Sequence, residues 1–108
     1  MQTNRLEKLL EFIKNEPEDP FLKYALATEY LRLKETDKAL VFYEDLVKNH
    51  TGYTGTYYHL GKLYEALGRK QEAISTYETG MKITREKNDN HAFSELRAVY
   101  DELMEEDD

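Results

Sequence analysis

The sequence repeats itself with a period of 34 residues, and this period constrains the fold more than any other feature. A shift by one period brings eight identical residues together within one repeat length, whereas average residue usage gives roughly two by chance. The identical pairs are Tyr24 with Tyr58, Leu26 with Leu60, Tyr30 with Tyr64, Leu33 with Leu67, Ala39 with Ala73, Tyr43 with Tyr77, Glu44 with Glu78 and Lys48 with Lys82. The period divides the chain into repeat one, residues 20–53, and repeat two, residues 54–87. Repeats of this length predict stacked pairs of helices.

Capping and turn residues indicate where the helices begin and end. Asp19 followed by Pro20 is typical of a helix start, and Gly68 is typical of the left-handed turn after a helix. Lys34 stands where repeat two has Gly68, so we expect it to adopt a positive φ. We predict helices over about 4–15, 20–33, 37–48 with Thr36 as N-cap, 55–67, 70–86 and 90–104.

The two ends of the chain flank these repeats in the predicted single domain of residues 1–108. Residues 1–19 are interpreted as a leading half-repeat, because the same shift lays Leu6, Leu9, Phe12 and Ile13 on apolar residues of the third helix. We expect these four side chains to be buried. Residues 88–108 leave the strict register and are interpreted as a terminal capping helix with an acidic tail. A shift of 36 residues, two more than the period, restores the alignment. Phe93, Leu96, Tyr100 and Leu103 then have the spacing of one helical face.

Repeat two resembles the tetratricopeptide repeat (TPR) family. The residues that have the family's spacing are Tyr57, Leu60, Gly61, Tyr64, Ala73 and Tyr77. Gly61 and Ala73 are small, as helices in close contact require. The resemblance implies an all-α fold, a TPR-like α-solenoid in which antiparallel helix pairs form a right-handed superhelix of about six helices. We expect Tyr30, Tyr43, Tyr64 and Tyr77 to pack in its core.

The same resemblance implies a peptide-binding groove, because in this family the first helices of successive repeats line a concave surface. The positions carried over are Phe21, Tyr24, Thr28, Leu31 and Arg32 of repeat one, and Gly55, Tyr58, Lys62, Glu65 and Ala66 of repeat two, with Ser94 and Ala98 as a further contribution. Alternatively, the terminal helix covers Tyr24 and Tyr58. The expected function is a non-catalytic scaffold module that binds a protein or peptide. The alternative is a structural subunit that forms a homodimer through one end of the solenoid.

Composition and motifs argue against several other functions. The formal net charge of −7 repels nucleic acid and anionic membranes, so neither is expected as a partner. There is no cysteine and no long apolar stretch, which favours the cytoplasm. His50, His59 and His91 lack the spacing of a metal site, and no nucleophile motif is present. His59 is more plausibly a solvated histidine than a base, so we expect neither an enzyme nor a cofactor.

Overall fold

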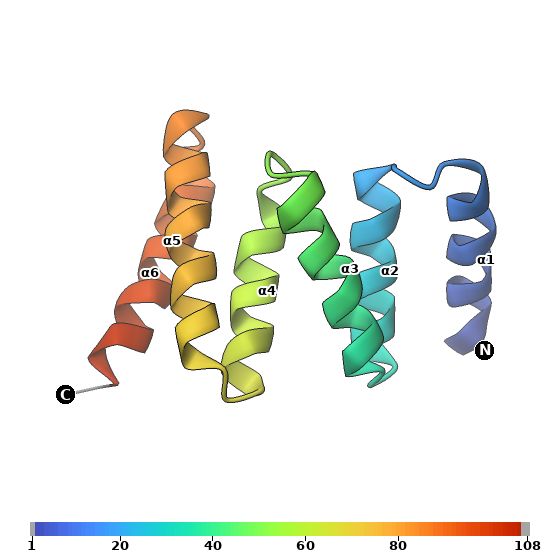
Figure 1. Cartoon of the computed structure of the whole chain (residues 1–108), viewed down its shortest axis with the longest axis horizontal. Coiled ribbons are helices and arrows are strands. Elements are labelled where there is room, and N and C mark those ends of the chain that lie inside the picture. The colour runs from blue at the N-terminus through green and yellow to red at the C-terminus, as the bar shows by residue number, and fades with distance from the viewer. Residues whose placement is uncertain (1, 107–108) are drawn as a thin grey trace. The chain divides into compact units, whose positions relative to one another are not determined.

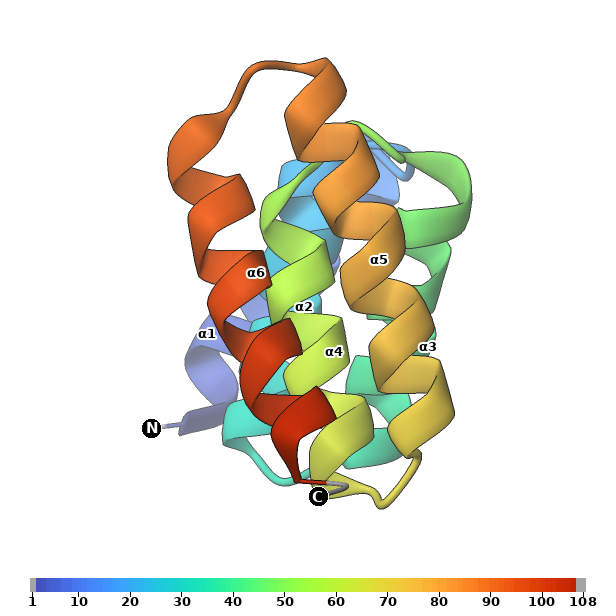
Figure 2. The same cartoon turned by 90° about the vertical axis from the view of Figure 1, so that its left-hand side faces the viewer.

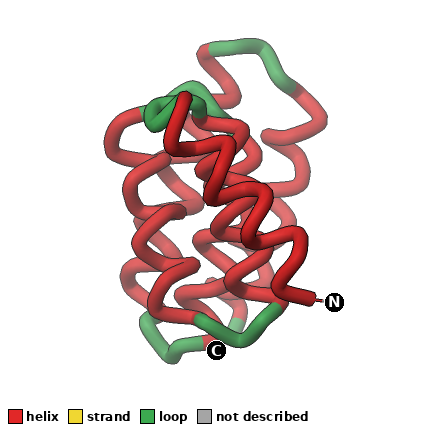
Figure 3. The backbone as a smooth tube through the Cα atoms, turned by 90° about the vertical axis from the view of Figure 1, so that its right-hand side faces the viewer, coloured by secondary structure: helices red, strands yellow, loops and turns green. Residues whose placement is uncertain are grey.

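The computed structural model describes residues 2–106, and the side chains of residues 4–106. The described residues form six helices and no strand (Figures 1 and 3). The helices are α1 (Gln2–Asn15), α2 (Pro20–Arg32), α3 (Thr36–Asn49), α4 (Gly55–Ala66), α5 (Lys70–Glu86) and α6 (Asn90–Glu105). The predicted all-α architecture is therefore confirmed. None of the described helices is both long enough and apolar enough to cross a membrane.

The helices are grouped into two compact units, Met1–Tyr53 and Thr54–Asp108. The boundary lies where the 34-residue period places the start of repeat two. The first unit holds α1, α2 and α3, and the second holds α4, α5 and α6 (Figure 1). The single domain and the right-handed superhelix stay predictions.

Helix α2 begins as its sequence predicts. Pro20 is its first residue, and the Asp19 carboxylate accepts the Phe21 backbone N–H at 2.9 Å. The prediction for α3 is wrong by one residue, because Thr36 is already helical and Glu35 is the N-cap, without a side-chain hydrogen bond. The Glu35 backbone N–H donates instead to the carbonyl of Tyr30 at 2.8 Å, which fixes Glu35 in the turn and lets the helix start at the next residue.

The turns after α2, α4 and α5 share one geometry. Lys34, Gly68 and Asn88 have φ values of 64°, 74° and 59°, and the residue after each donates to the carbonyl five residues before it, at 2.8, 2.8 and 2.9 Å. These bonds satisfy the open carbonyls of the helix ends. The positive φ predicted for Lys34 is confirmed.

In the first unit, α2 packs against both α1 and α3. The buried side chains come mainly from α2 and α3, and include Leu22, Leu26, Tyr30, Ala39, Tyr43 and Leu46. The prediction for α1 is only partly right. Leu9 is buried, Leu6 and Ile13 are half-buried, and Phe12 is 57% exposed. The reason is that α1 packs mainly against α2, so it buries one narrow face, and Phe12 lies outside it.

In the second unit, α5 packs against α4 and α6, and α4 also contacts α6 (Figure 2). Gly61 permits the close contact with α5, since a Cβ built there would lie 2.1 Å from Cε1 of the Tyr77 ring. Gly80 permits a second contact, since its Cβ would lie 2.6 Å from Cβ of Tyr57 and 2.9 Å from Cδ1 of Leu96. Gly61 was predicted to have this role. Gly80 was not, because repeat one has Leu46 at its position.

Helix α6 extends slightly further than predicted. It includes Glu105, which was expected in the acidic tail, while residues 107–108 of that tail lie outside the described residues. Leu96 and Leu103 are buried as expected, together with Val99. Phe93 and Tyr100 are only half-buried.

Candidate binding surfaces

The predicted groove residues of α2 lie on a partly exposed face of the first unit. Phe21 is 59% exposed at the start of the helix, and Thr28 and Arg32 are exposed, whereas Tyr24 and Leu31 are half-buried. The capping bond from Phe21 to Asp19 fixes the backbone that carries the phenylalanine ring. This face therefore begins with a large apolar side chain in contact with solvent.

Tyr24 is held by other tyrosines of the same unit. Its ring centroid lies 6.2 Å from that of Tyr43, at an interplanar angle of 70°, and 5.6 Å from that of Tyr53. Burial raises the pKa of Tyr24. The hydroxyl oxygens of Thr28 and Tyr43 lie 3.2 Å apart, at hydrogen-bonding distance. Tyr24 and Thr28 consequently support the packing of α2 on α3 as well as facing outward.

Arg32 is engaged by a carboxylate of its own helix. Its guanidinium forms an ion pair with the buried Glu29, which also lies 3.4 Å from Arg5 Nε. The hydrogen bond from Arg32 lowers the pKa of Glu29. Arg32 thus neutralises a buried charge, and a ligand would have to compete with Glu29 for it.

The predicted groove residues of α4 lie in the second unit. Lys62 and Ala66 are exposed, and Tyr58 and Glu65 are half-buried. Glu65 accepts a hydrogen bond from the Tyr77 hydroxyl and lies 3.9 Å from Lys62 Nζ. Burial raises the pKa of Tyr77, and the bond to Glu65 raises it further. Glu65 therefore links the outer face of α4 to the core.

A pocket of about 320 Å³ lies between the start of α4 and α6. It is lined by Thr54, Gly55, Tyr58, His59, Ala92, Glu95 and Leu96. Tyr58 thus borders an open space rather than being covered completely by the terminal helix. Ser94 and Ala98 of α6, which were predicted as a further contribution to the groove, are both exposed.

His59 has an altered environment at the edge of this pocket. Partial burial lowers its pKa, and the nearby carboxylate of Glu95 acts in the opposite direction. Its ring lies 5.6 Å from the Tyr58 ring, edge to face. Among the residues that the structure describes, no group of three His, Asp or Glu side chains could hold a metal ion.

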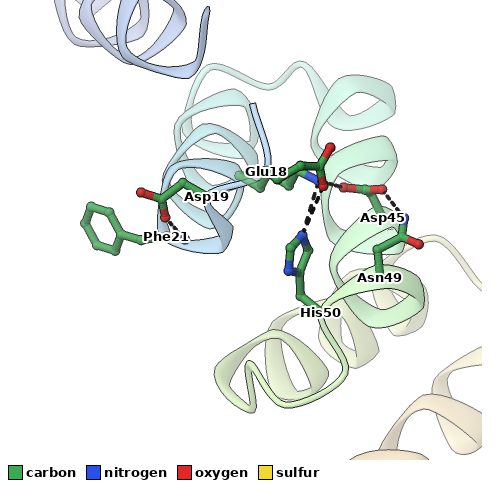
Figure 4. A network of polar contacts seen from close by, with 7 residues as sticks. Glu18, Asp19, Phe21, Asp45, Asn49 and His50 are labelled. Carbon is green, nitrogen blue, oxygen red and sulfur yellow. Dashed lines mark hydrogen bonds and ion pairs between the residues drawn. The ribbon is translucent and has the colours of Figure 1, made fainter. Parts of the chain in front are cut away.

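One polar network was missed by the sequence analysis (Figure 4). Lys23 is only 5% exposed, and its Nζ lies 2.9 Å from Glu18 Oε1, 2.5 Å from Asp45 Oδ2 and 3.3 Å from His50 Nε2. Asn49 donates to the other oxygen of Asp45 at 2.6 Å. The repeat alignment contains a signal for this network, because Lys23 stands where repeat two has the aromatic Tyr57.

A larger groove, also not predicted, lies between α5 and α6 and has a volume of about 500 Å³. Its apolar lining consists of Met81, Phe93 and Tyr100. Its charged lining consists of Lys82, Arg85, Arg97, Glu78 and Glu86. The Arg85 guanidinium carbon lies 4.8 Å from the centroid of the Phe93 ring, in the geometry of a cation–π contact.

Comparison with known proteins links the chain to one family. The sequence profile of the tetratricopeptide repeat matches residues 54–87. A solution structure of a tetratricopeptide repeat domain protein from Salinibacter ruber is 46% identical, with 81% of this chain and 88% of that chain covered and a TM-score of 0.77. A crystal structure of a tetratricopeptide repeat domain protein from the same organism is 45% identical, with 81% and 97% covered and a TM-score of 0.77.

A third solved structure is similar in fold alone. This solution structure of a protein from Bordetella parapertussis is 22% identical, with 94% of this chain and 88% of that chain covered and a TM-score of 0.79. The search of curated proteins found no match.

Proposed function

Because the chain belongs to the tetratricopeptide repeat family, we propose that it is a non-catalytic module that binds a protein or peptide through α2 and α4. Repeats of this family generally mediate protein–protein interaction. The proposed contact residues form one set in each unit: Phe21, Tyr24, Thr28, Leu31 and Arg32 on α2, and Tyr58, Lys62, Glu65 and Ala66 on α4.

The observation that carries the proposal is the environment of Tyr58. Its half-buried side chain lines an open pocket whose lining also includes the polar residues Thr54, His59 and Glu95. An aromatic anchor with a few polar groups around it is the composition of surfaces that recognise peptides. Phe21 offers a comparable apolar side chain on α2.

Charge and composition support the same class of partner. The net charge of −7 favours a protein over nucleic acid or an anionic membrane. The absence of cysteine accords with the cytoplasm, where we place the protein.

The rival function, a homodimer through one end of the solenoid, is opposed by two arginines. Close helix contact in repeat two requires Gly61 and Ala73, but α6 has Arg97 at the position of Gly61 and α1 has Arg5 at the position of Ala73. Arg97 pairs with Asp101 at 3.1 Å, and Arg5 lies 3.4 Å from Glu29. A further helix would therefore have to displace these side chains to approach either end as closely as α5 approaches α4.

The test compares the proteins captured by the wild type, a double variant and a control variant. The wild-type chain, the Phe21→Ser/Tyr58→Ser variant and a Val41→Ser control are used as bait in a lysate of the source organism, and bound proteins are quantified by mass spectrometry. Val41 is a matched control because it is 64% exposed but lies on α3. We expect the double variant to bind its partner roughly 30-fold more weakly, which corresponds to about 2 kcal/mol of binding free energy at a hot spot. Equal capture by the double variant would refute the proposal.

A further inference from the structure

The groove between α5 and α6 exposes side chains that are covered in the preceding repeat. A shift of 36 residues aligns Phe93 with Tyr57 and Tyr100 with Tyr64. Tyr57 and Tyr64 are 1% and 6% exposed, because α5 packs over their side of α4. Phe93 and Tyr100 are half-buried, and no helix among the described residues packs over them in the same way. Two aromatic rings and Met81 thus form the apolar floor of an open groove.

A second helix of the repeat type does not fit this groove. At Gly61, the absence of a side chain lets the Tyr77 ring approach within a distance that a Cβ would block. The aligned residue of α6 is Arg97, whose Nε lies 3.1 Å from Asp101 Oδ1. Arg97 and its ion pair therefore stand at the repeat position where a helix would have to approach closely. An extended chain is narrower than a helix and does not need this close approach.

The charged residues of the groove favour an acidic occupant. Of its three cations, Arg97 is paired with Asp101, which leaves Lys82 and Arg85, and one of its two carboxylates, Glu78, accepts a hydrogen bond from the Tyr100 hydroxyl at 3.1 Å. Neither Lys82 nor Arg85 has a carboxylate partner among the described residues.

The position of Arg85 is suited to a carboxylate. Its guanidinium lies over the Phe93 ring, with 4.8 Å from its central carbon to the ring centroid. A cation–π contact does not use the N–H groups of a guanidinium, which can still bind both oxygens of a carboxylate. A ligand carboxylate at Arg85 would therefore lie next to the aromatic floor.

We propose that the groove between α5 and α6 is a second peptide site, which binds an extended acidic segment with an apolar side chain on Phe93 and Tyr100 and a neighbouring carboxylate on Arg85 and Lys82. This site is separate from the surface on α2 and α4, and it lies entirely within the second unit. It gives the protein a surface that recognises charge and shape together.

The test uses a defined probe. A fluorescent heptapeptide, blocked at both ends, carries one leucine between two aspartates in a background of glycine and serine. Fluorescence anisotropy with the full chain should give saturable binding that weakens as salt rises. Probes with asparagine in place of aspartate, or with serine in place of leucine, should each bind at least about tenfold more weakly, because each lacks one half of the recognised chemistry.

Variants locate the site. Arg85→Gln and Lys82→Gln should each weaken binding of the acidic probe, Arg85→Gln by about tenfold or more. Lys48→Gln is the matched control, since Lys48 has the same repeat position as Lys82 but lies on α3, and it should bind as the wild type does. All three residues are exposed, so we expect the variants to fold, and circular dichroism verifies this.

Amide chemical shifts provide a second readout. The probe should move the signals of Met81, Arg85, Phe93 and Tyr100 and leave those of Phe21 and Tyr58 in place. The proposal is overturned by the absence of saturable binding, by equal binding of the asparagine probe, by unchanged affinity of the Arg85 variant, or by shifts confined to α2 and α4. The last outcome would leave the surface proposed on α2 and α4 as the peptide site.

Discussion

At the scale of single residues, Lys23 replaces a hydrophobic contact by a charged one. Tyr57 is the buried aromatic at this position in repeat two, whereas repeat one buries a lysine between Glu18 and Asp45. Burial lowers the pKa of Lys23, but its hydrogen bonds to Asp45 and Glu18 raise this pKa overall. A buried charge persists only when it is paired and hydrogen-bonded, so Lys23, Glu18 and Asp45 form one ion-pair network.

This ion-pair network should make the free energy of unfolding depend on pH in the acid range. The hydrogen bonds from Lys23 lower the pKa of Asp45 from its ordinary 3.8 and that of Glu18 from its ordinary 4.5. A lowered pKa in the folded state contributes stability above the unfolded value, and this contribution is lost as pH falls through the folded value. We expect the wild type to lose stability from about pH 4.5 downward, and Lys23→Met to lose less over the same interval. Urea titrations at several pH values measure how the free energy of unfolding of each protein changes with pH. The same change in the wild type and in Lys23→Met would contradict the assignment.

Thr56 offers a prediction of the opposite sign. Its hydroxyl is fully buried and has no hydrogen-bond partner among the described residues, and repeat one has Leu22 at its position. Thr56→Val removes the unsatisfied hydroxyl at almost constant volume and should raise the free energy of unfolding by about 1 kcal/mol. Thr84→Val is the control, because the equally buried Thr84 hydroxyl donates to the Gly80 carbonyl at 2.9 Å. This variant should lower the free energy of unfolding by about 1 kcal/mol. A loss in both variants by thermal melting would show that Thr56 is hydrogen-bonded in solution.

At the scale of elements, the distance between α4 and α5 depends on Gly61. A methyl group there would overlap the Tyr77 ring, so Gly61→Ala should lower the free energy of unfolding by about 1–3 kcal/mol. Gly55→Ala is the control in the same helix, since nothing lies within 4 Å of a Cβ at that position. The control should be neutral or stabilising by up to about 1 kcal/mol. Equal stabilities in urea would show that α4 and α5 pack less closely.

The elements were predictable to the extent that local signals decide them. The period, Asp19 with Pro20 and the turn at Gly68 placed the helices within one or two residues of their observed ends. Contacts decided the rest. Phe12 aligns with a buried leucine but is exposed, because α1 packs mainly against one neighbour. The α5–α6 groove depends on how two helices lie together, which no spacing in the sequence records.

At the scale of the whole molecule, the arginines at both ends predict the state of association. Arg5 and Arg97 stand where close helix contact needs alanine and glycine, so we expect the chain to remain monomeric over a wide range of concentrations. Multi-angle light scattering measures this directly. A variant with Arg5→Ala and Arg97→Ala removes both obstacles and should associate more readily than the wild type. A wild-type dimer that the two substitutions leave unchanged would show that other surfaces join the subunits.

The three left-handed turns have a consequence for degradation. Lys34 and Lys87 are exposed and lie in or beside these turns, so each offers trypsin a side chain that it recognises. A protease binds an extended stretch of chain, however, and the turns hold their backbone in hydrogen bonds to the preceding helix. Cutting therefore requires local opening first, and the rate of cleavage at Lys34 or Lys87 reports how often the end of α2 or α5 unwinds.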